Sequence, residues 1–98
     1  MKPNDNSRQA ILTAAVKLAN DVGLLQFSRI DIANAAGVGQ STVSYHFGTM
    51  PEVRTAIVKH AVEHEMLKIL ADARSCREKI GVPMSAALRK KVAKYIAA

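Results

Sequence analysis

Apolar residues recur at helical spacing along most of the chain, and turn residues divide them into segments. The first segment begins near Asn6, where Asn6 and Gln9 have the spacing of a capping box, and it stops at Gly23. Leu24 and Leu25 follow, and we expect them to cover the core. The apolar residues form one wide stripe, which predicts an amphipathic helix. They are Ile11, Leu12, Ala15, Leu18, Ala19 and Val22.

Residues 28–47 contain two further short helical patterns. Ser28 and Asp31 have the spacing of a capping box, and Phe27 and Ile32 occupy the two positions of a hydrophobic staple. A helix is therefore predicted to begin directly after Ser28. Its apolar residues are Ile30, Ile32, Ala33 and Ala36.

Gly37 follows this helix where a left-handed C-cap residue belongs, and Gly39 lets the chain turn. A second short helix is predicted from Gln40, with Val43 and Phe47 facing inward. Short polar side chains on its outward face are typical of a helix that reads base edges in a major groove, so we interpret the hairpin as a helix-turn-helix. The alternative is an ordinary helical hairpin with a solvated polar face. The outward residues are Gln40, Ser41, Thr42, Ser44, Tyr45 and His46.

The string AGVGQSTVSYHF, preceded by IDIANA and followed by GTMPEV, resembles the DNA-binding region of the TetR family of bacterial transcriptional regulators. The resemblance covers about residues 7–62 and implies a three-helix domain whose third helix enters the major groove. Side chains at the start of that helix would reach base edges, and Tyr45 and His46 would meet phosphates. Arg29 would meet a phosphate or an adjacent minor groove. The implied DNA-binding residues are Ser28, Arg29, Gln40, Ser41, Thr42, Ser44, Tyr45 and His46.

Three features depart from the usual pattern of the family. Ser44 stands where a tyrosine is usual, and Met50 stands where a lysine usually opens the fourth helix. Both changes predict weaker or differently distributed contacts with the DNA backbone. At Met50 a positive charge is lost, and only the amides at the start of the helix are left to bind a phosphate. Typical members also continue into a helical domain that binds a small effector, whereas only 36 residues follow Val62. We therefore expect no small-molecule effector, and the size suits a regulator of a phage or plasmid.

The segment after the hairpin begins with another capping box, Thr49 and Glu52, with Pro51 in the first turn. No breaker follows for many residues, so the pattern predicts one long helix from about Met50 to Arg77. Its main apolar stripe consists of Val53, Ile57, Ala61, Met66, Ile69, Leu70 and Ala73. A second set lies off this stripe and predicts a face for a partner: Val58, Val62 and Leu67.

Gly81–Pro83 then breaks the chain, and a last helix is predicted to begin near Ser85. It would contain Leu88, Val92, Tyr95 and Ile96. The sequence thus predicts an all-α fold, in which a helix-turn-helix domain precedes a long helix and a short C-terminal helix. We divide it into residues 1–49, an N-terminal arm with the three-helix DNA-binding region, and residues 50–98, which we expect to serve dimerisation.

Composition supports one small helical domain, since 49% of the 98 residues are hydrophobic and only 4% are aromatic. The net charge of +6 favours a polyanionic partner, although residues 1–47 carry only +1 of it. Cys76 is the single cysteine, which excludes an internal disulfide and suits a reducing compartment. No signal peptide or membrane-span pattern is apparent, so we expect a cytoplasmic, nucleoid-associated protein without membrane contact.

His60, Glu63 and His64 have the H-x-x-E-H spacing of some zinc peptidases. A catalytic zinc also needs a third protein ligand and a substrate cleft, for which this short chain has little room. We therefore interpret the two histidines as facing solvent or an interface, and expect no enzyme activity, metal or cofactor. The basic segment from Arg89 to Lys94 could contact phosphate or an acidic protein, and we favour a solvated face.

These observations favour a sequence-specific regulator of transcription that binds double-stranded DNA as a homodimer. Repression by occlusion is favoured over activation by contact with polymerase. A dimer is expected because one module of this size offers few base contacts, whereas a two-fold pair presents two reading helices. Two alternatives stay open. One is a protein-interaction module that retains the fold, such as an antirepressor or a regulator of replication or partition. The other is a non-specific DNA binder.

Overall fold

The computed structural model describes residues 5–76 and 80–97, and every regular element in these ranges is a helix. The predicted all-α fold is therefore confirmed. The arm over residues 1–4 and the Arg77 end of the predicted long helix lie outside the described residues, as does the side chain of Asn6. In chain order the helices are α1 (Asp5–Val22), α2 (Arg29–Ala36), α3 (Gln40–Phe47), α4 (Met50–His64), α5 (Leu67–Ser75) and α6 (Ala86–Ala97).

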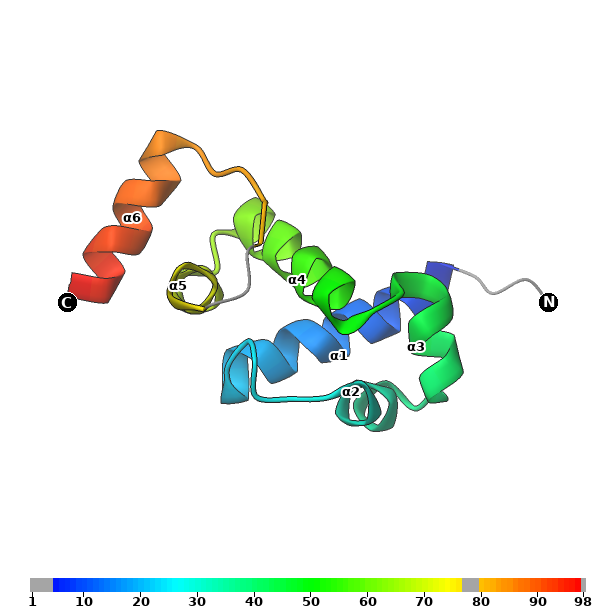
Figure 1. Cartoon of the computed structure of the whole chain (residues 1–98). Coiled ribbons are helices and arrows are strands. Elements are labelled where there is room, and N and C mark those ends of the chain that lie inside the picture. The colour runs from blue at the N-terminus through cyan, green and yellow to red at the C-terminus, as the bar shows by residue number, and fades with distance from the viewer. Residues whose placement is uncertain (1–4, 77–79, 98) are drawn as a thin grey trace.

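The helices form an elongated body of 45 × 22 × 20 Å. Helix α1 packs against α2, α3, α4 and α5, so it is the central helix of the N-terminal half. Helices α2 and α3 lie at one end of the molecule, and α5 pairs with α6 at the other (Figure 1). The helix-turn-helix therefore projects away from the C-terminal helices.

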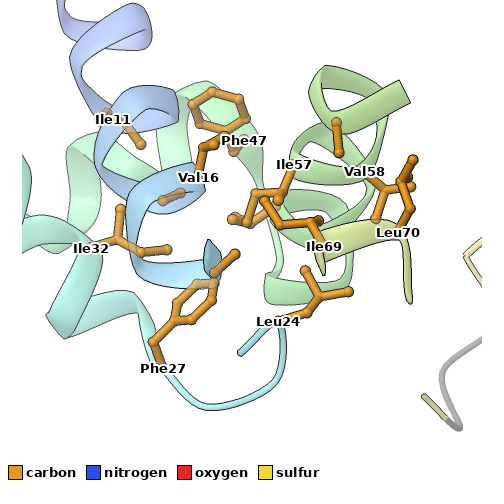
Figure 2. Packing of buried hydrophobic residues seen from close by; sticks show 14 of the residues in the cluster. Ile11, Val16, Leu24, Phe27, Ile32, Phe47, Ile57, Val58, Ile69 and Leu70 are labelled. Carbon is orange, nitrogen blue, oxygen red and sulfur yellow. The ribbon is translucent and has the colours of Figure 1, made fainter. Parts of the chain in front are cut away.

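One hydrophobic core contains side chains from all six helices, and Figure 2 shows its central part. Ile11, Ile32, Val43 and Ile57 are completely buried, as their periodicity predicts. Burial of each such side chain contributes about 1.5–3 kcal/mol, so this cluster is the main source of stability. Within the described ranges, no helix is both long enough and apolar enough to cross a bilayer.

Three residues that the pattern assigned to the core face solvent. Val22 is 50% exposed, Leu25 45% and Ile30 49%, so these assignments were wrong. Val22 ends α1, Leu25 lies in the turn after it and Ile30 lies in the first turn of α2. Val16, which is buried, takes part in the core instead.

The prediction of one long helix from Met50 to Arg77 was also wrong. Helix α4 ends at His64, and Glu65 adopts the left-handed conformation with φ 51° and ψ 48°. The Met66 N–H then donates to the Ala61 carbonyl at 2.9 Å, which closes the end of α4 before α5 begins. The left-handed Glu65 costs about 1–2 kcal/mol.

Packing of α5 offsets this cost. The change of direction lets Ile69 and Leu70 reach the core, where both are completely buried. The Asp72 carboxylate also accepts a hydrogen bond from the Leu24 N–H at 3.3 Å, which ties α5 to the turn after α1. Val58 is only 3% exposed, so the partner-facing side that we predicted around it is at this point covered by the chain itself.

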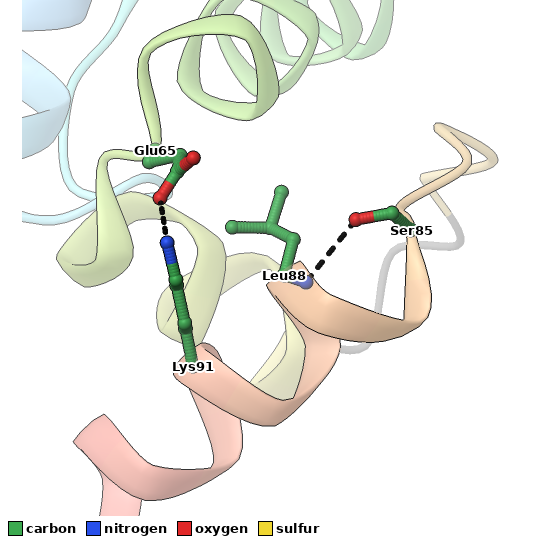
Figure 3. A network of polar contacts seen from close by, with 4 residues as sticks. All are labelled: Glu65, Ser85, Leu88 and Lys91. Atoms are coloured by element: carbon green, nitrogen blue, oxygen red, sulfur yellow. Dashed lines mark hydrogen bonds and ion pairs between the residues drawn. The ribbon is translucent and has the colours of Figure 1, made fainter.

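Helix α6 begins where the sequence predicts. The Ser85 hydroxyl accepts a hydrogen bond from the Leu88 N–H at 3.1 Å, and Lys91 pairs with Glu65 at 2.6 Å (Figure 3). Leu88 and Val92 are buried against the rest of the chain. The last turn is different, because Tyr95 and Ile96 are 46% and 48% exposed on the same helix.

Candidate nucleic-acid interface

The start of α2 is fixed by the capping box that the sequence predicts. The Ser28 N–H donates to the Asp31 carboxylate at 2.8 Å, and the Ser28 hydroxyl donates to the same oxygen at 3.1 Å. Phe27 and Ile32 are both buried, as a hydrophobic staple requires. Ser28 is exposed, and its two hydrogen bonds to Asp31 hold it in one position.

The turn between α2 and α3 depends on Gly37, which has φ 72° and ψ 33°. The Val38 N–H donates to the Ala33 carbonyl at 3.0 Å, so the predicted left-handed C-cap is confirmed. Gly39 precedes α3 in an extended conformation and has no side chain to cap it. The Thr42 N–H donates to the Gly39 carbonyl at 3.1 Å, and no acidic residue lies in the first turn to repel an anion.

Helix α3 separates an inner and an outer face. Val43 is completely buried and Phe47 is 8% exposed, which fixes the helix against the core. On the outer side, Tyr45 is 71% exposed. The six residues predicted to face outward are here named the reading face. Three of them are exposed: Gln40, Ser41 and Tyr45. The other three are partly buried: Thr42, Ser44 and His46.

His46 points partly inward from the end of the reading face. Its ring stands edge-on to Tyr45, with 5.2 Å between ring centroids and 80° between planes. The Nε2 atom is buried and has no hydrogen-bond partner among the described residues. A phosphate contact through this atom would require a change in side-chain rotamer.

Arg29 connects the first helix of the hairpin to the end of the second. One of its terminal nitrogens, Nη2, lies 3.5 Å from the Gly48 carbonyl oxygen, a long hydrogen bond. The Nε atom is buried without a partner in the described part of the chain. Part of the Arg29 guanidinium therefore lies inside the protein, whereas the sequence predicted only a contact with DNA.

The start of α4 offers little to an anion. Thr49 and Glu52 form the predicted capping box, with the Thr49 N–H donating to Glu52 at 3.1 Å and the Glu52 N–H donating to the Thr49 hydroxyl at 3.4 Å. Met50 is partly buried and packs against the core. Because a carboxylate already lies at this helix end, a phosphate would have to compete with it.

A groove of about 550 Å³ lies between α1, α3 and α4, next to the last turn of α3. Arg8 lies on one wall with its guanidinium carbon 4.7 Å from the centroid of the Phe47 ring, a cation–π contact. Lys59, His60 and His64 line the opposite wall on α4. Sequence periodicity did not identify Arg8 or Lys59 as groove residues, because the groove depends on how α1 crosses α4.

His60 and His64 lie close together in this groove, with 4.2 Å between ring centroids. Partial burial and the neighbouring His64 lower the pKa of His60, while Glu63 opposes the shift. Among the described residues, no three His, Cys, Asp or Glu side chains converge on a common metal position.

The helix-turn-helix lies inside the part of the chain that matches a known family. Residues 11–57 match the family described as bacterial regulatory proteins, tetR family. The chain contains a TetR-family DNA-binding region. The match extends from Ile11 in α1 to Ile57 in α4 and includes all of α2 and α3. Neither the curated proteins nor the solved structures gave a significant match.

The TetR-family region supports a DNA-binding regulator of transcription as the general function. The predicted resemblance is therefore confirmed for the DNA-binding region. The matched interval contains every predicted DNA-binding residue, from Ser28 to His46.

Proposed function

We propose that the chain is a sequence-specific repressor of transcription that binds double-stranded DNA as a homodimer. The observation that carries the proposal is the division of α3, which buries Val43 and Phe47 and leaves Gln40, Ser41 and Tyr45 exposed. A helix held from one side, with short polar side chains on the other, has the shape and chemistry needed to enter a major groove.

Each part of the reading face has a distinct proposed role. Gln40, Ser41 and Thr42 belong to the first turn of α3, where side chains reach base edges, and an amide such as that of Gln40 pairs well with adenine. Ser44, Tyr45 and His46 follow, and we assign them to the DNA backbone. Outside the reading face, we assign Ser28 and Arg29 to flanking phosphates.

We further propose that residues 50–98 mediate dimerisation. Tyr95 and Ile96 are half-exposed apolar side chains on α6, and their burial against a second copy would contribute favourably. A two-fold dimer would place two α3 helices about 34 Å apart along the duplex, one turn of DNA. Occlusion of a promoter by such a dimer needs no small-molecule effector, so we propose repression without one.

A protein-interaction module that keeps this fold is the second candidate function. The arrangement at the start of α4 favours it, because Met50 packs inward and Glu52 adds negative charge where a DNA phosphate would approach. The net charge of only +1 over residues 1–47 points the same way.

Selection from a pool of random duplexes separates these candidates. The purified chain is incubated with the pool at near-physiological salt, and the bound fraction is sequenced. We expect a palindromic consensus with two half-sites about one helical turn apart. Binding that varies with salt but not with sequence would indicate the non-specific binder. No retained DNA at all would favour the protein-interaction module.

A further inference from the structure

The groove between α1, α3 and α4 contains all three histidines of the chain, here named the histidine groove: His46, His60 and His64. Two of them form a close pair on α4. His60 is partly buried and His64 is exposed at the last position of the helix. The proposed DNA contacts use His46 alone, so the pair on α4 has no role in them.

The pair has the arrangement of a helical chelate. Residues four apart lie on the same face of a helix, and here the two rings lie 4.2 Å apart with 32° between their planes. A tetrahedral Zn²⁺ with Zn–N bonds of about 2.0–2.1 Å needs its two nitrogens about 3.3 Å apart. Chelation requires the two side chains to rotate until one nitrogen of each ring reaches that separation, and the exposed position of His64 leaves it room to rotate.

We propose that His60 and His64 together bind one divalent transition-metal ion per chain, of the class that prefers imidazole, such as Zn²⁺ or Ni²⁺. Water molecules complete the coordination, since no third His, Cys, Asp or Glu of the described residues joins the pair. Imidazole ligands select this class against Mg²⁺ and Ca²⁺, which prefer oxygen. The site is distinct from the reading face and does not depend on the proposed DNA binding.

The surroundings are compatible with a cation. Glu52 and Glu63 line the groove together with Arg8 and Lys59, so the formal charges of these four side chains balance. A structural zinc site with four protein ligands binds much more tightly than a pair can. The proposed site is therefore an exchangeable one that responds to the metal concentration, and hydrolytic chemistry is not expected of it.

Metal titration of the full chain tests the proposal. Protein stripped with a chelator is titrated with Zn²⁺, Ni²⁺ and Mg²⁺ separately by calorimetry, and the imidazole signals of His60 and His64 are followed by NMR. We expect saturation at one Zn²⁺ or Ni²⁺ per chain, selective shifts of these two imidazoles, and no binding of Mg²⁺. His60→Gln and His64→Gln are each expected to weaken binding at least about tenfold, since even indirect partners of a metal change affinity by 10–100-fold.

Two control variants locate the ion. His46→Gln removes the third histidine of the groove and Cys76→Ser removes the only thiol, and both should bind Zn²⁺ like the wild type. Unchanged affinity in His60→Gln and His64→Gln would overturn the proposal, as would loss of binding in either control. Circular dichroism establishes whether each variant is folded. The imidazole NMR shifts of the wild type during the titration test, without any substitution, whether the ion binds at His60 and His64.

Discussion

The Glu52 carboxylate occupies the space that a β-carbon on Gly48 would fill. It is held there because it accepts a hydrogen bond from the Thr49 N–H at 3.1 Å, as part of the capping box that begins α4. Gly48 itself has φ 78° and ψ −129°, a conformation that other residues rarely adopt. The backbone conformation favours glycine at the junction between α3 and α4, and a β-carbon there would also displace the Glu52 carboxylate from its capping position.

Gly48→Ala is accordingly expected to lower the free energy of unfolding by about 2–3 kcal/mol, through backbone strain and overlap with Glu52. Gly37→Ala is a matched comparison, because Gly37 also has positive φ but a β-carbon there would meet nothing within 4 Å. It should cost only the strain, about 1 kcal/mol. Urea denaturation measures both values.

A double-mutant cycle isolates the overlap. Adding Glu52→Ala to Gly48→Ala removes the overlapping carboxylate, so the double variant should be more stable than the sum of the two single effects predicts. Strict additivity, or equal costs at Gly37 and Gly48, would contradict the described junction.

The position of α5 gives a second prediction. Ile69 is completely buried, whereas Ile30 is 49% exposed, although the sequence pattern assigned both to apolar faces. Ile69→Ala should lower the free energy of unfolding by about 2–5 kcal/mol, and Ile69→Val by about 0.5–1.5 kcal/mol if the alanine variant does not fold. Ile30→Ala should change it by no more than about 0.5 kcal/mol. Similar costs at both positions in urea melts would disprove the packing of α5.

His60 gives a prediction for the dependence of stability on pH. Because its pKa in the folded protein is lowered below 6.5, the unfolded chain takes up a proton first as the pH falls. The contribution of His60 to the free energy of unfolding is constant above pH 6.5. Below pH 6.5 the free energy of unfolding decreases until the pH has passed the pKa of His60 in the folded protein.

His60→Gln removes this contribution. In metal-free solution, the difference in urea midpoint between wild type and His60→Gln should be constant above pH 6.5 and shift in favour of the variant below it. A difference in urea midpoint that stays constant across the whole pH range would contradict this prediction, because it would mean that His60 has the same pKa in the folded and the unfolded chain.

The helix-turn-helix was predictable because its signals are local. Ser28 with Asp31 and Thr49 with Glu52 are capping pairs within a few residues, and Gly37 marks the turn by its own conformation. Such features depend little on the rest of the fold. The position of Val43 and Phe47 on the inner face of α3 followed from helical spacing in the same way.

Features set by tertiary packing could not be read from the sequence. Glu65 breaks the helix although neither glycine nor proline is present, because burial of Ile69 and Leu70 outweighs the cost of its left-handed conformation. The exposure of Ile30 likewise depends on which helices cover it. Helical spacing shows that apolar residues share a face, but not whether a neighbour packs there.

The proposed DNA contacts are tested most directly by the affinity of variants of the reading face for the selected duplex and a scrambled one, at one fixed salt concentration. Gln40→Ala and Thr42→Ala should each lose about 1–3 kcal/mol of binding to the selected duplex and little on the scrambled one. Asn20→Ala, an exposed polar change on α1, is the control and should bind like the wild type. Equal affinities of all the proteins for both duplexes would contradict sequence reading by α3.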